Sequence, residues 1–155
     1  MMTRLSCDVL NALAGKTLVT AESCTGGGIG AALTAIPGSS AVYKGGIISY
    51  TNWVKENILG VDGAVLLEHG AVSGPVAEAM AVGARKILNA DISVSVTGLA
   101  GPDGDDRGNP IGLVYIGYAD CNHVKCVKCF FTGNRDQIRQ QAIETALSIV
   151  LQNNQ

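Results

Sequence analysis

The sequence has few charged and few aromatic residues. Charged residues make up 15% of the 155 residues, against roughly 25% in an average soluble domain, and aromatic residues make up 5%. Lysines and arginines form no cluster and the formal net charge is -2, so the basic surface of a nucleic-acid-binding protein is missing. No apolar run approaches the ~18 residues of a membrane span, and the N-terminus lacks the apolar core of a signal peptide. We therefore expect a cytoplasmic protein with no nucleic-acid or membrane partner.

The five cysteines are an odd number, which without a secretory signal favours free thiols in a reducing compartment. Cys126-x-x-Cys129, with Cys121 and His123 nearby, has the spacing of half a zinc site. The segment has strand propensity, however, and residues three apart in a strand point to opposite faces of the sheet. We therefore predict no metal and no cofactor.

Apolar residues make up 47% of the chain, and there are 20 glycines. A chain of this length buries about two thirds of its unfolded surface, so its core needs no disulfides. Apolar periodicity predicts helices at 3–14, 28–34, 52–59, 66–70, 75–88 and 134–151, and strands at 16–21, 41–51, 91–97, 111–119 and 123–132. This order predicts one three-layer α/β/α domain over residues 1–155, with a mixed, mostly parallel sheet that ends in an antiparallel hairpin.

The turn after the first predicted strand is the most informative segment, with the sequence Thr20-Ala-Glu-Ser-Cys-Thr-Gly-Gly-Gly28. A glycine turn that opens a helix directs backbone N–H groups toward the positive end of the helix dipole, which suits a phosphate or carboxylate. The hydroxyls of Ser23 and Thr25 would add donors. The alternative is a tight turn with an ordinary helix cap.

The same turn contains Gly26-x-Gly28-x-x-Ala31, which formally fits a dinucleotide-binding fingerprint. That fingerprint requires an acidic residue about 20 positions later, to hold the ribose hydroxyls. The first acidic residue after the turn is Glu56, so a Rossmann-type site is disfavoured. The absence of Gly-Lys-Ser or Gly-Lys-Thr likewise excludes a P-loop.

Tyr50 and Lys55 form a second candidate group. If Asn52 caps the helix that follows, Lys55 is its third residue, where the dipole opposes a positive charge by up to ~1 kcal/mol. A neutral amine there could take a proton from a serine hydroxyl, and Tyr50 could relay or donate one. The alternatives are a solvated lysine and a packing tyrosine.

Thr97-Gly-Leu-Ala-Gly-Pro102 lies at the carboxyl end of a predicted strand, where ligands gather in open α/β sheets. The polar loop 98–110 is long enough to be a candidate functional loop. Its aspartates could hold a metal, but Arg107 breaks the calcium-loop pattern, so we predict a solvated loop.

Arg135 and Arg139 lie one turn apart where the last helix begins. One of them could form a bidentate clamp on an anion. The alternative is a solvated helix face.

Six motifs follow one another along the chain. They are Ala21-Glu-Ser-Cys-Thr-Gly-Gly27, Pro37-Gly-Ser-Ser40, Gly46-x-x-x-Tyr50-x-Asn52-x-x-Lys55, Gly70-Ala-Val-Ser73, Thr97-Gly-Leu-Ala-Gly-Pro102 and Asn134-Arg-x-x-Ile-Arg139. Together they resemble the CinA C-terminal domain family, the nicotinamide-nucleotide amidases. The resemblance covers residues 3–151 and implies a three-layer α/β/α fold. It also implies a metal-independent hydrolase that converts nicotinamide mononucleotide to nicotinate mononucleotide and ammonia in pyridine nucleotide recycling.

The resemblance implies that Ser23 and Ser40 are the two hydroxyls of interest and that Tyr50 and Lys55 handle protons. It also marks Thr97 and Arg135 as substrate contacts. From the glycine turn and the segment at 97–102, we predict five more substrate contacts: Thr25, Gly26, Gly27, Gly98 and Gly101. We expect Ser40 to be the nucleophile, because the glycine turn after Ser23 would hold the 5′-phosphate. Lys55 would take the serine proton, and backbone N–H groups would stabilise the oxyanion.

Two other functions use the same residues. The chain could be a catalytically silent nucleotide-binding or interaction module, or a zinc-dependent regulatory protein that uses its cysteines. The serine, tyrosine and lysine set favours the amidase. Small apolar residues along the helix at 75–88 suggest either a homo-oligomeric interface or a buried core helix, and we expect a homo-oligomer.

Overall fold

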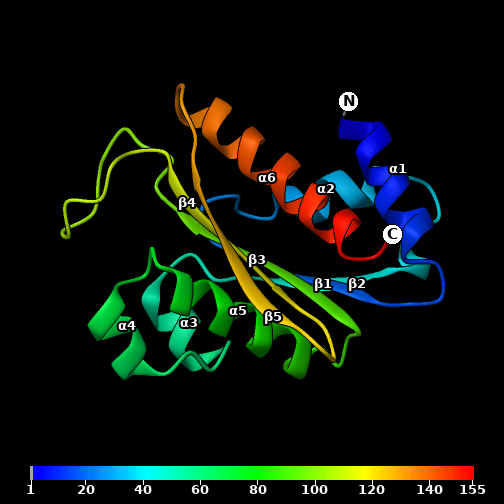
Figure 1. The fold of residues 1–155 in the computed structure, drawn as a ribbon, viewed down its shortest axis with the longest axis horizontal. Helices are drawn as coiled ribbons and strands as arrows, with labels where there is room; N and C mark the ends of the chain where they lie inside the picture. Colours follow the sequence, from blue (N-terminus) through cyan, green and yellow to red (C-terminus); the bar gives the residue numbers. More distant parts are fainter. Residues whose placement is uncertain (1) are drawn as a thin grey trace.

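The computed structural model describes residues 2–155, in which five strands form one mixed sheet in the order β2-β1-β3-β4-β5 (Figure 1). β1 (Leu18–Glu22) lies between β2 (Tyr43–Ile48) and β3 (Ile92–Gly98) and is parallel to both. β4 (Leu113–Ala119) is antiparallel to β3 and to β5 (Val124–Phe130). Four of the five strands therefore run in one direction, and the carboxyl ends of β1, β2 and β3 meet at one edge.

Helices cover both faces of this sheet (Figure 1). One face carries α1 (Met2–Ala12), α2 (Gly28–Thr34) and α6 (Arg135–Gln152), and the other carries α3 (Asn52–Asn57), α4 (Gly63–His69) and α5 (Gly74–Ile87). Two buried apolar clusters fill the spaces between the layers. The expected three-layer α/β/α architecture is confirmed. Within residues 2–155, no helix is long and apolar enough to cross a membrane.

The small apolar stripe of α5 is part of the core. Val76, Met80 and Ala84 are fully buried and pack in the cluster between α5 and the sheet. Gly117 of β4 lets the backbone of α5 approach closely, because a Cβ there would collide with the carbonyl oxygen of Ala77. Core packing therefore explains the stripe without an intermolecular interface.

β2 is shorter than the strand expected at 41–51, because a 3₁₀ turn, η1 (Ser39–Ala41), precedes it. Leu18 pairs with Tyr43 and Val19 with Gly45, so one extra residue bulges out between the two pairs. The expected interruption near Gly45 is thus a β-bulge, in which this glycine adopts a φ of 155°.

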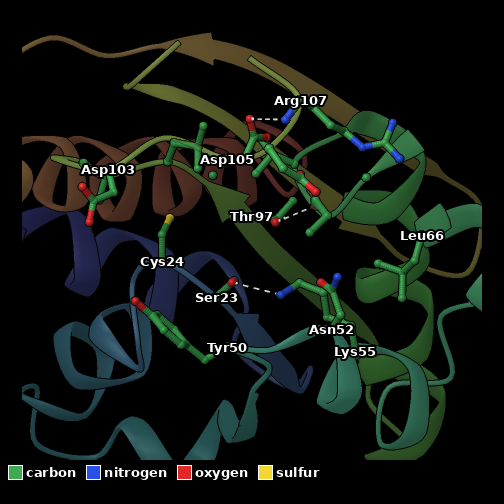
Figure 2. Close-up of a pocket in the computed structure, with 18 of the residues that line it drawn as sticks. Ser23, Cys24, Tyr50, Asn52, Lys55, Leu66, Thr97, Asp103, Asp105 and Arg107 are labelled. Atoms are coloured by element: carbon green, nitrogen blue, oxygen red, sulfur yellow. Dashed lines mark hydrogen bonds between the residues drawn. The ribbon is translucent and has the colours of Figure 1, made fainter. Parts of the chain in front are cut away.

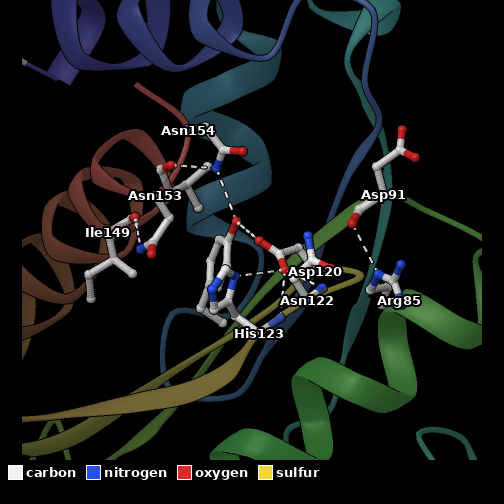
Figure 3. Close-up of polar contacts among 10 residues, drawn as sticks. Arg85, Asp91, Asp120, Asn122, His123, Ile149, Asn153 and Asn154 are labelled. Carbon is white, nitrogen blue, oxygen red and sulfur yellow. Dashed lines mark hydrogen bonds and ion pairs between the residues drawn. The ribbon is translucent and has the colours of Figure 1, made fainter.

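A polar cluster closes the β4–β5 hairpin at the sheet edge opposite the carboxyl ends of β1 to β3 (Figure 3). The Asp120 carboxylate accepts hydrogen bonds of 2.8 Å from the backbone N–H groups of Asn122 and His123 and from the hydroxyl of Tyr118. Asn154, just beyond α6, donates to the same hydroxyl at 3.1 Å. The cluster ties the hairpin to the C-terminal end of α6.

Cys126 and Cys129 lie on opposite faces of β5, as strand geometry predicts. Cys126 faces α5, where its sulfur lies beside Gly74, whereas Cys129 packs against the core beneath α6. All five cysteines are free thiols. Among residues 2–155, no group of three or more histidine, cysteine or acidic side chains is arranged to hold a metal ion.

Candidate active site

A cavity of about 780 Å³ opens at the edge where β1, β2 and β3 end (Figure 2). Its lining comes from five parts of the chain: the turn after β1, the segment that leads into α3, the α4–α5 region, the loop after β3 and the start of α6. Among the predicted site residues, it includes Ser23, Tyr50, Lys55, Thr97, Gly98, Gly101 and Arg135. In an open α/β sheet this edge is the expected place for a ligand.

Ser23 and Lys55 form the centre of the cavity. Ser23 follows β1 directly, and its backbone N–H still pairs with Val96 of β3 at 3.0 Å. The Nζ atom of Lys55 lies 3.1 Å from the Ser23 Oγ atom and 2.7 Å from the carbonyl oxygen of Ser49. Lys55 is 2% exposed and Ser23 is 8% exposed. The carbonyl of Ser49 therefore fixes the amine at hydrogen-bond distance from one hydroxyl.

Burial lowers the pKa of the Lys55 amine to about 8. The sequence predicts a lowered pKa from the helix dipole, with Asn52 as the cap, and this reason is wrong. Thr51 is the cap, accepting a hydrogen bond from the Val54 N–H at 3.4 Å, and Lys55 is the fourth of only six residues in α3. The amine is neutral more often than a surface lysine because it is removed from water.

Ser40 lies at the wrong edge of the sheet to react with Lys55. It belongs to η1, which precedes the amino end of β2, whereas Lys55 follows the carboxyl end of that strand. Six strand residues at ~3.3 Å each separate the two ends by roughly 20 Å. The expectation that Ser40 is the nucleophile is therefore corrected. It followed the order of the chain, whereas the parallel pairing of β1 with β2 brings Ser23 to the lysine.

The glycine turn after Ser23 is occupied by a carboxylate of the chain itself. Glu22, 2% exposed, accepts hydrogen bonds from the Thr25 hydroxyl at 2.7 Å and from the N–H groups of Ile29 at 2.8 Å and Gly30 at 3.0 Å. These amides belong to the first turn of α2, which is where a phosphate was expected. Thr25, Gly26 and Gly27 do not line the cavity. Their prediction as phosphate contacts is corrected, because Glu22 already fills the site.

Arg135 joins the far side of the cavity to Tyr50. Its guanidinium donates to the carbonyl of Gly101 at 2.6 Å and to the Tyr50 hydroxyl at 3.2 Å. Tyr50 is 58% exposed at the mouth, so its hydroxyl is open to a ligand. The structure thus brings together Tyr50, Gly101 and Arg135, which are far apart in the sequence.

Thr97 has a structural contact instead of a free hydroxyl. It is 1% exposed, and its Oγ1 atom donates to the carbonyl of Ala71 at 2.8 Å. This bond ties the end of β3 to the segment between α4 and α5. The bond uses the hydroxyl hydrogen of Thr97. Both Thr97 and Gly98 line the cavity, so their contact with a substrate stays a prediction.

Three further residues shape the site, of which Cys24 and Arg107 were not predicted to do so and Arg139 was predicted only as a possible clamp on an anion. Cys24 lines the cavity, and burial raises the pKa of its thiol to about 11, so the thiol stays protonated beside Ser23. Arg139 donates to the carbonyls of Cys24 at 3.0 Å and Thr25 at 3.1 Å and so braces the turn from outside. Arg107, expected in a solvated loop, lines the cavity. The signals visible in the sequence were the position of Cys24 next to Ser23, the spacing of Arg139 from Arg135 and the length of the loop that contains Arg107.

Comparison with known proteins identifies the family. The CinA C-terminal domain matches residues 3–153. CinA-like proteins of Cyanothece sp. and Gemmatimonas aurantiaca are 52% and 47% identical over 85% and 84% of this chain. These regions are 32% and 31% of the two relatives, so the chain spans about a third of their length.

Solved structures share the whole fold. The competence/damage inducible protein CihA from Agrobacterium tumefaciens matches with a TM-score of 0.95 and 39% identity, over 99% of this chain and 96% of that chain. A competence-damaged protein (CinA) superfamily protein from Enterobacter cloacae matches with a TM-score of 0.97 and 30% identity, over 100% and 93%. The chain therefore belongs to the CinA C-terminal domain family.

Proposed function

We propose that this protein is an amidohydrolase that converts nicotinamide mononucleotide to nicotinate mononucleotide and ammonia, with Ser23 as nucleophile and Lys55 as general base. The observation that carries the proposal is the buried contact of 3.1 Å between the Lys55 amine and the Ser23 hydroxyl. A buried lysine with a lowered pKa can act as a base near neutral pH. The assignment to the CinA family supports an amidase.

In the first half of the reaction, the Ser23 oxygen attacks the carboxamide carbon and its proton passes to the neutral amine of Lys55. The carbonyl of Ser49 receives a hydrogen bond from the same amine, which leaves the nitrogen lone pair free to face Ser23. The tetrahedral intermediate carries a negative oxygen, for which the backbone N–H of Cys24, the residue of this turn that lines the cavity, would supply a donor. Lys55 therefore ends this step as an ammonium ion.

In the second half, the ammonium of Lys55 returns its proton to the leaving nitrogen, and ammonia departs as the carbon–nitrogen bond breaks. Water then attacks the ester on Ser23 and gives a proton to Lys55. The second tetrahedral intermediate then collapses, and the Lys55 ammonium returns this proton to the leaving Ser23 oxygen, which restores the hydroxyl and the neutral amine. The carboxylic acid so released loses its own proton to solvent. Tyr50, at the cavity mouth, is placed to orient the substrate together with Arg135.

The cavity suits a mononucleotide in size and charge. Its volume of about 780 Å³ lies within the usual range of roughly 300–1,000 Å³ for small-molecule sites. Arg135 at its rim offers a guanidinium for the 5′-phosphate, and Glu56 and Asp103 provide negative charge for the pyridinium. These features and the family resemblance support nicotinamide mononucleotide as the substrate.

Ammonia release from nicotinamide mononucleotide, measured in buffer with EDTA, tests the proposal. Ser23→Ala should lower turnover by at least about a thousandfold, because no covalent intermediate can form. Ser40→Ala, at the opposite edge, is the matched control and should keep wild-type turnover. Full activity in Ser23→Ala, or its loss in Ser40→Ala, would contradict the assignment. Binding of the nucleotide without any ammonia release would identify the silent module instead.

A further inference from the structure

The loop between β3 and β4 forms a wall of the cavity. Its base is closed by two backbone hydrogen bonds, from Leu99 to the carbonyl of Leu113 at 2.9 Å and from Gly112 to that of Leu99 at 2.8 Å. Every residue from Leu99 to Asp103 lines the cavity, as do Asp105, Asp106 and Arg107. The position of this loop therefore determines the width of the cavity.

The tip of the loop is fastened to α4 by one side chain. The guanidinium of Arg107 donates to the carbonyl oxygen of Glu68 at 3.0 Å and to that of Leu67. Both carbonyls belong to the last turn of α4, where the helix dipole favours a cation. Figure 2 shows the Arg107 guanidinium turned toward this helix, away from Ser23 and Lys55.

Residues of both α4 and the loop accommodate the Arg107 side chain. Gly70, at the end of α4, has a φ of +78°, and a Cβ there would come within 2.5 Å of the Arg107 Nε atom. On the loop side, the Asp105 carboxylate accepts hydrogen bonds from the N–H groups of Arg107 at 3.2 Å and Asn109 at 3.0 Å. It also accepts one from the Asn109 side chain at 2.6 Å. Gly70 thus leaves room for the Arg107 side chain beside α4, and Asp105 fixes the backbone of the loop around Arg107.

We propose that Arg107 is a positioning residue that latches the loop at 99–112 onto α4 and so holds the wall of the cavity opposite Ser23 and Lys55. The Thr97–Ala71 bond ties the same two regions together at the inner end of the loop. The Arg107 latch is the tie at the outer end. Its effect on substrate binding rests on the proposed function, whereas its effect on the loop does not.

Hydrogen exchange measured by mass spectrometry tests the latch directly. In Arg107→Ala, peptides covering 99–112 should exchange roughly tenfold faster or more, because two hydrogen bonds to a charged donor are lost. Peptides of β1 and β3 should be unchanged. Gly70→Ala should loosen the same loop, and should add little in the Arg107→Ala background. Arg85→Ala is the matched control, since Arg85 also donates to a carbonyl, that of Asp91 at 3.0 Å, but at the other edge of the sheet.

Kinetics with nicotinamide mononucleotide provide the second readout. Arg107→Ala should raise KM about three- to tenfold with kcat within about twofold of wild type, since Ser23 and Lys55 are untouched. Wild-type exchange of the 99–112 peptides in Arg107→Ala would overturn the latch, whether or not the protein releases ammonia. Faster exchange throughout the molecule would also overturn it, because it would indicate general destabilisation.

Discussion

Lys55 is a costly residue at its position. Burial lowers its pKa from 10.5 to about 8, which costs roughly 3 kcal/mol of stability at neutral pH. The sign follows because the unfolded chain, in which the pKa is higher, binds the proton more tightly. The cost is fully present below about pH 8 and disappears as the pH rises to 10.5. At the scale of one residue, this loss of stability is what the proposed role of Lys55 as a general base requires, because a base near neutral pH needs the lowered pKa.

The pH dependence of turnover follows from the same residue. Only the neutral amine accepts the Ser23 proton, so log kcat/KM should rise with a slope near one below about pH 7.5 and level off above about pH 8.5. The measurement is initial ammonia release from nicotinamide mononucleotide between pH 6 and pH 10. A profile still rising at pH 10 would show that Lys55 titrates as an ordinary solvated lysine. A flat profile would show that the protonation of Lys55 does not control the reaction.

The sequence predicts the residue types of the site but not their partners. It singles out Ser23, Tyr50, Lys55 and Arg135, and all four line the cavity. It does not contain the strand order, which puts Ser23 rather than Ser40 beside Lys55. It also gives no sign that the carboxylate of Glu22 turns back to the helix that follows it.

At the scale of elements, α2 depends on Glu22 for its first turn. α2 has seven residues, and its cap residue Gly27 offers no side chain, so Glu22 satisfies the amides of Ile29 and Gly30 from the end of β1. A helix of this length is unstable alone. The carboxylate thus connects strand, turn and helix around Ser23.

Glu22→Gln should lower the free energy of unfolding by about 1–3 kcal/mol, because an amide replaces a charged acceptor and can offer only one oxygen. Urea denaturation measures this. Asp8→Asn, on the exposed side of α1, is the control and should have little effect. A loss no greater than in the control would show that these hydrogen bonds contribute little.

Helices and strands were predicted most accurately where the apolar pattern extends over many residues. The helices at 75–88 and 134–151 and the terminal hairpin are confirmed, because each carries several turns or an alternating pattern. The short elements are also found, but between residues 41 and 70 their bounds differ from the predicted ones. The strand expected at 41–51 is β2 at Tyr43–Ile48, with a bulge and a preceding 3₁₀ turn, and the helix expected at 66–70 is α4 at Gly63–His69. There, tertiary contacts outweigh local preference.

At the scale of the whole molecule, the two ends of the strands carry different features. The carboxyl ends of β1 to β3 carry the cavity, and the opposite edge carries the cluster of Tyr118, Asp120 and Asn154. Stability and activity should therefore be separable by substitution.

Tyr118→Phe should lower the free energy of unfolding by about 1 kcal/mol through its two lost hydrogen bonds, with kcat/KM within about twofold of wild type. Tyr50→Phe should do the reverse, lowering kcat/KM while leaving the unfolding midpoint unchanged, since Tyr50 is 58% exposed. Urea denaturation and ammonia release measure the pair. Equal effects of both substitutions on activity would refute the separation.

The turn between β4 and β5 also has a practical consequence. Cys121 there is the one exposed thiol among the five, since Cys24 is buried and the other three are partly covered. A maleimide dye or a solid support would attach chiefly at this position. The native sequence therefore allows labelling or immobilisation with the edge that carries the cavity facing outward.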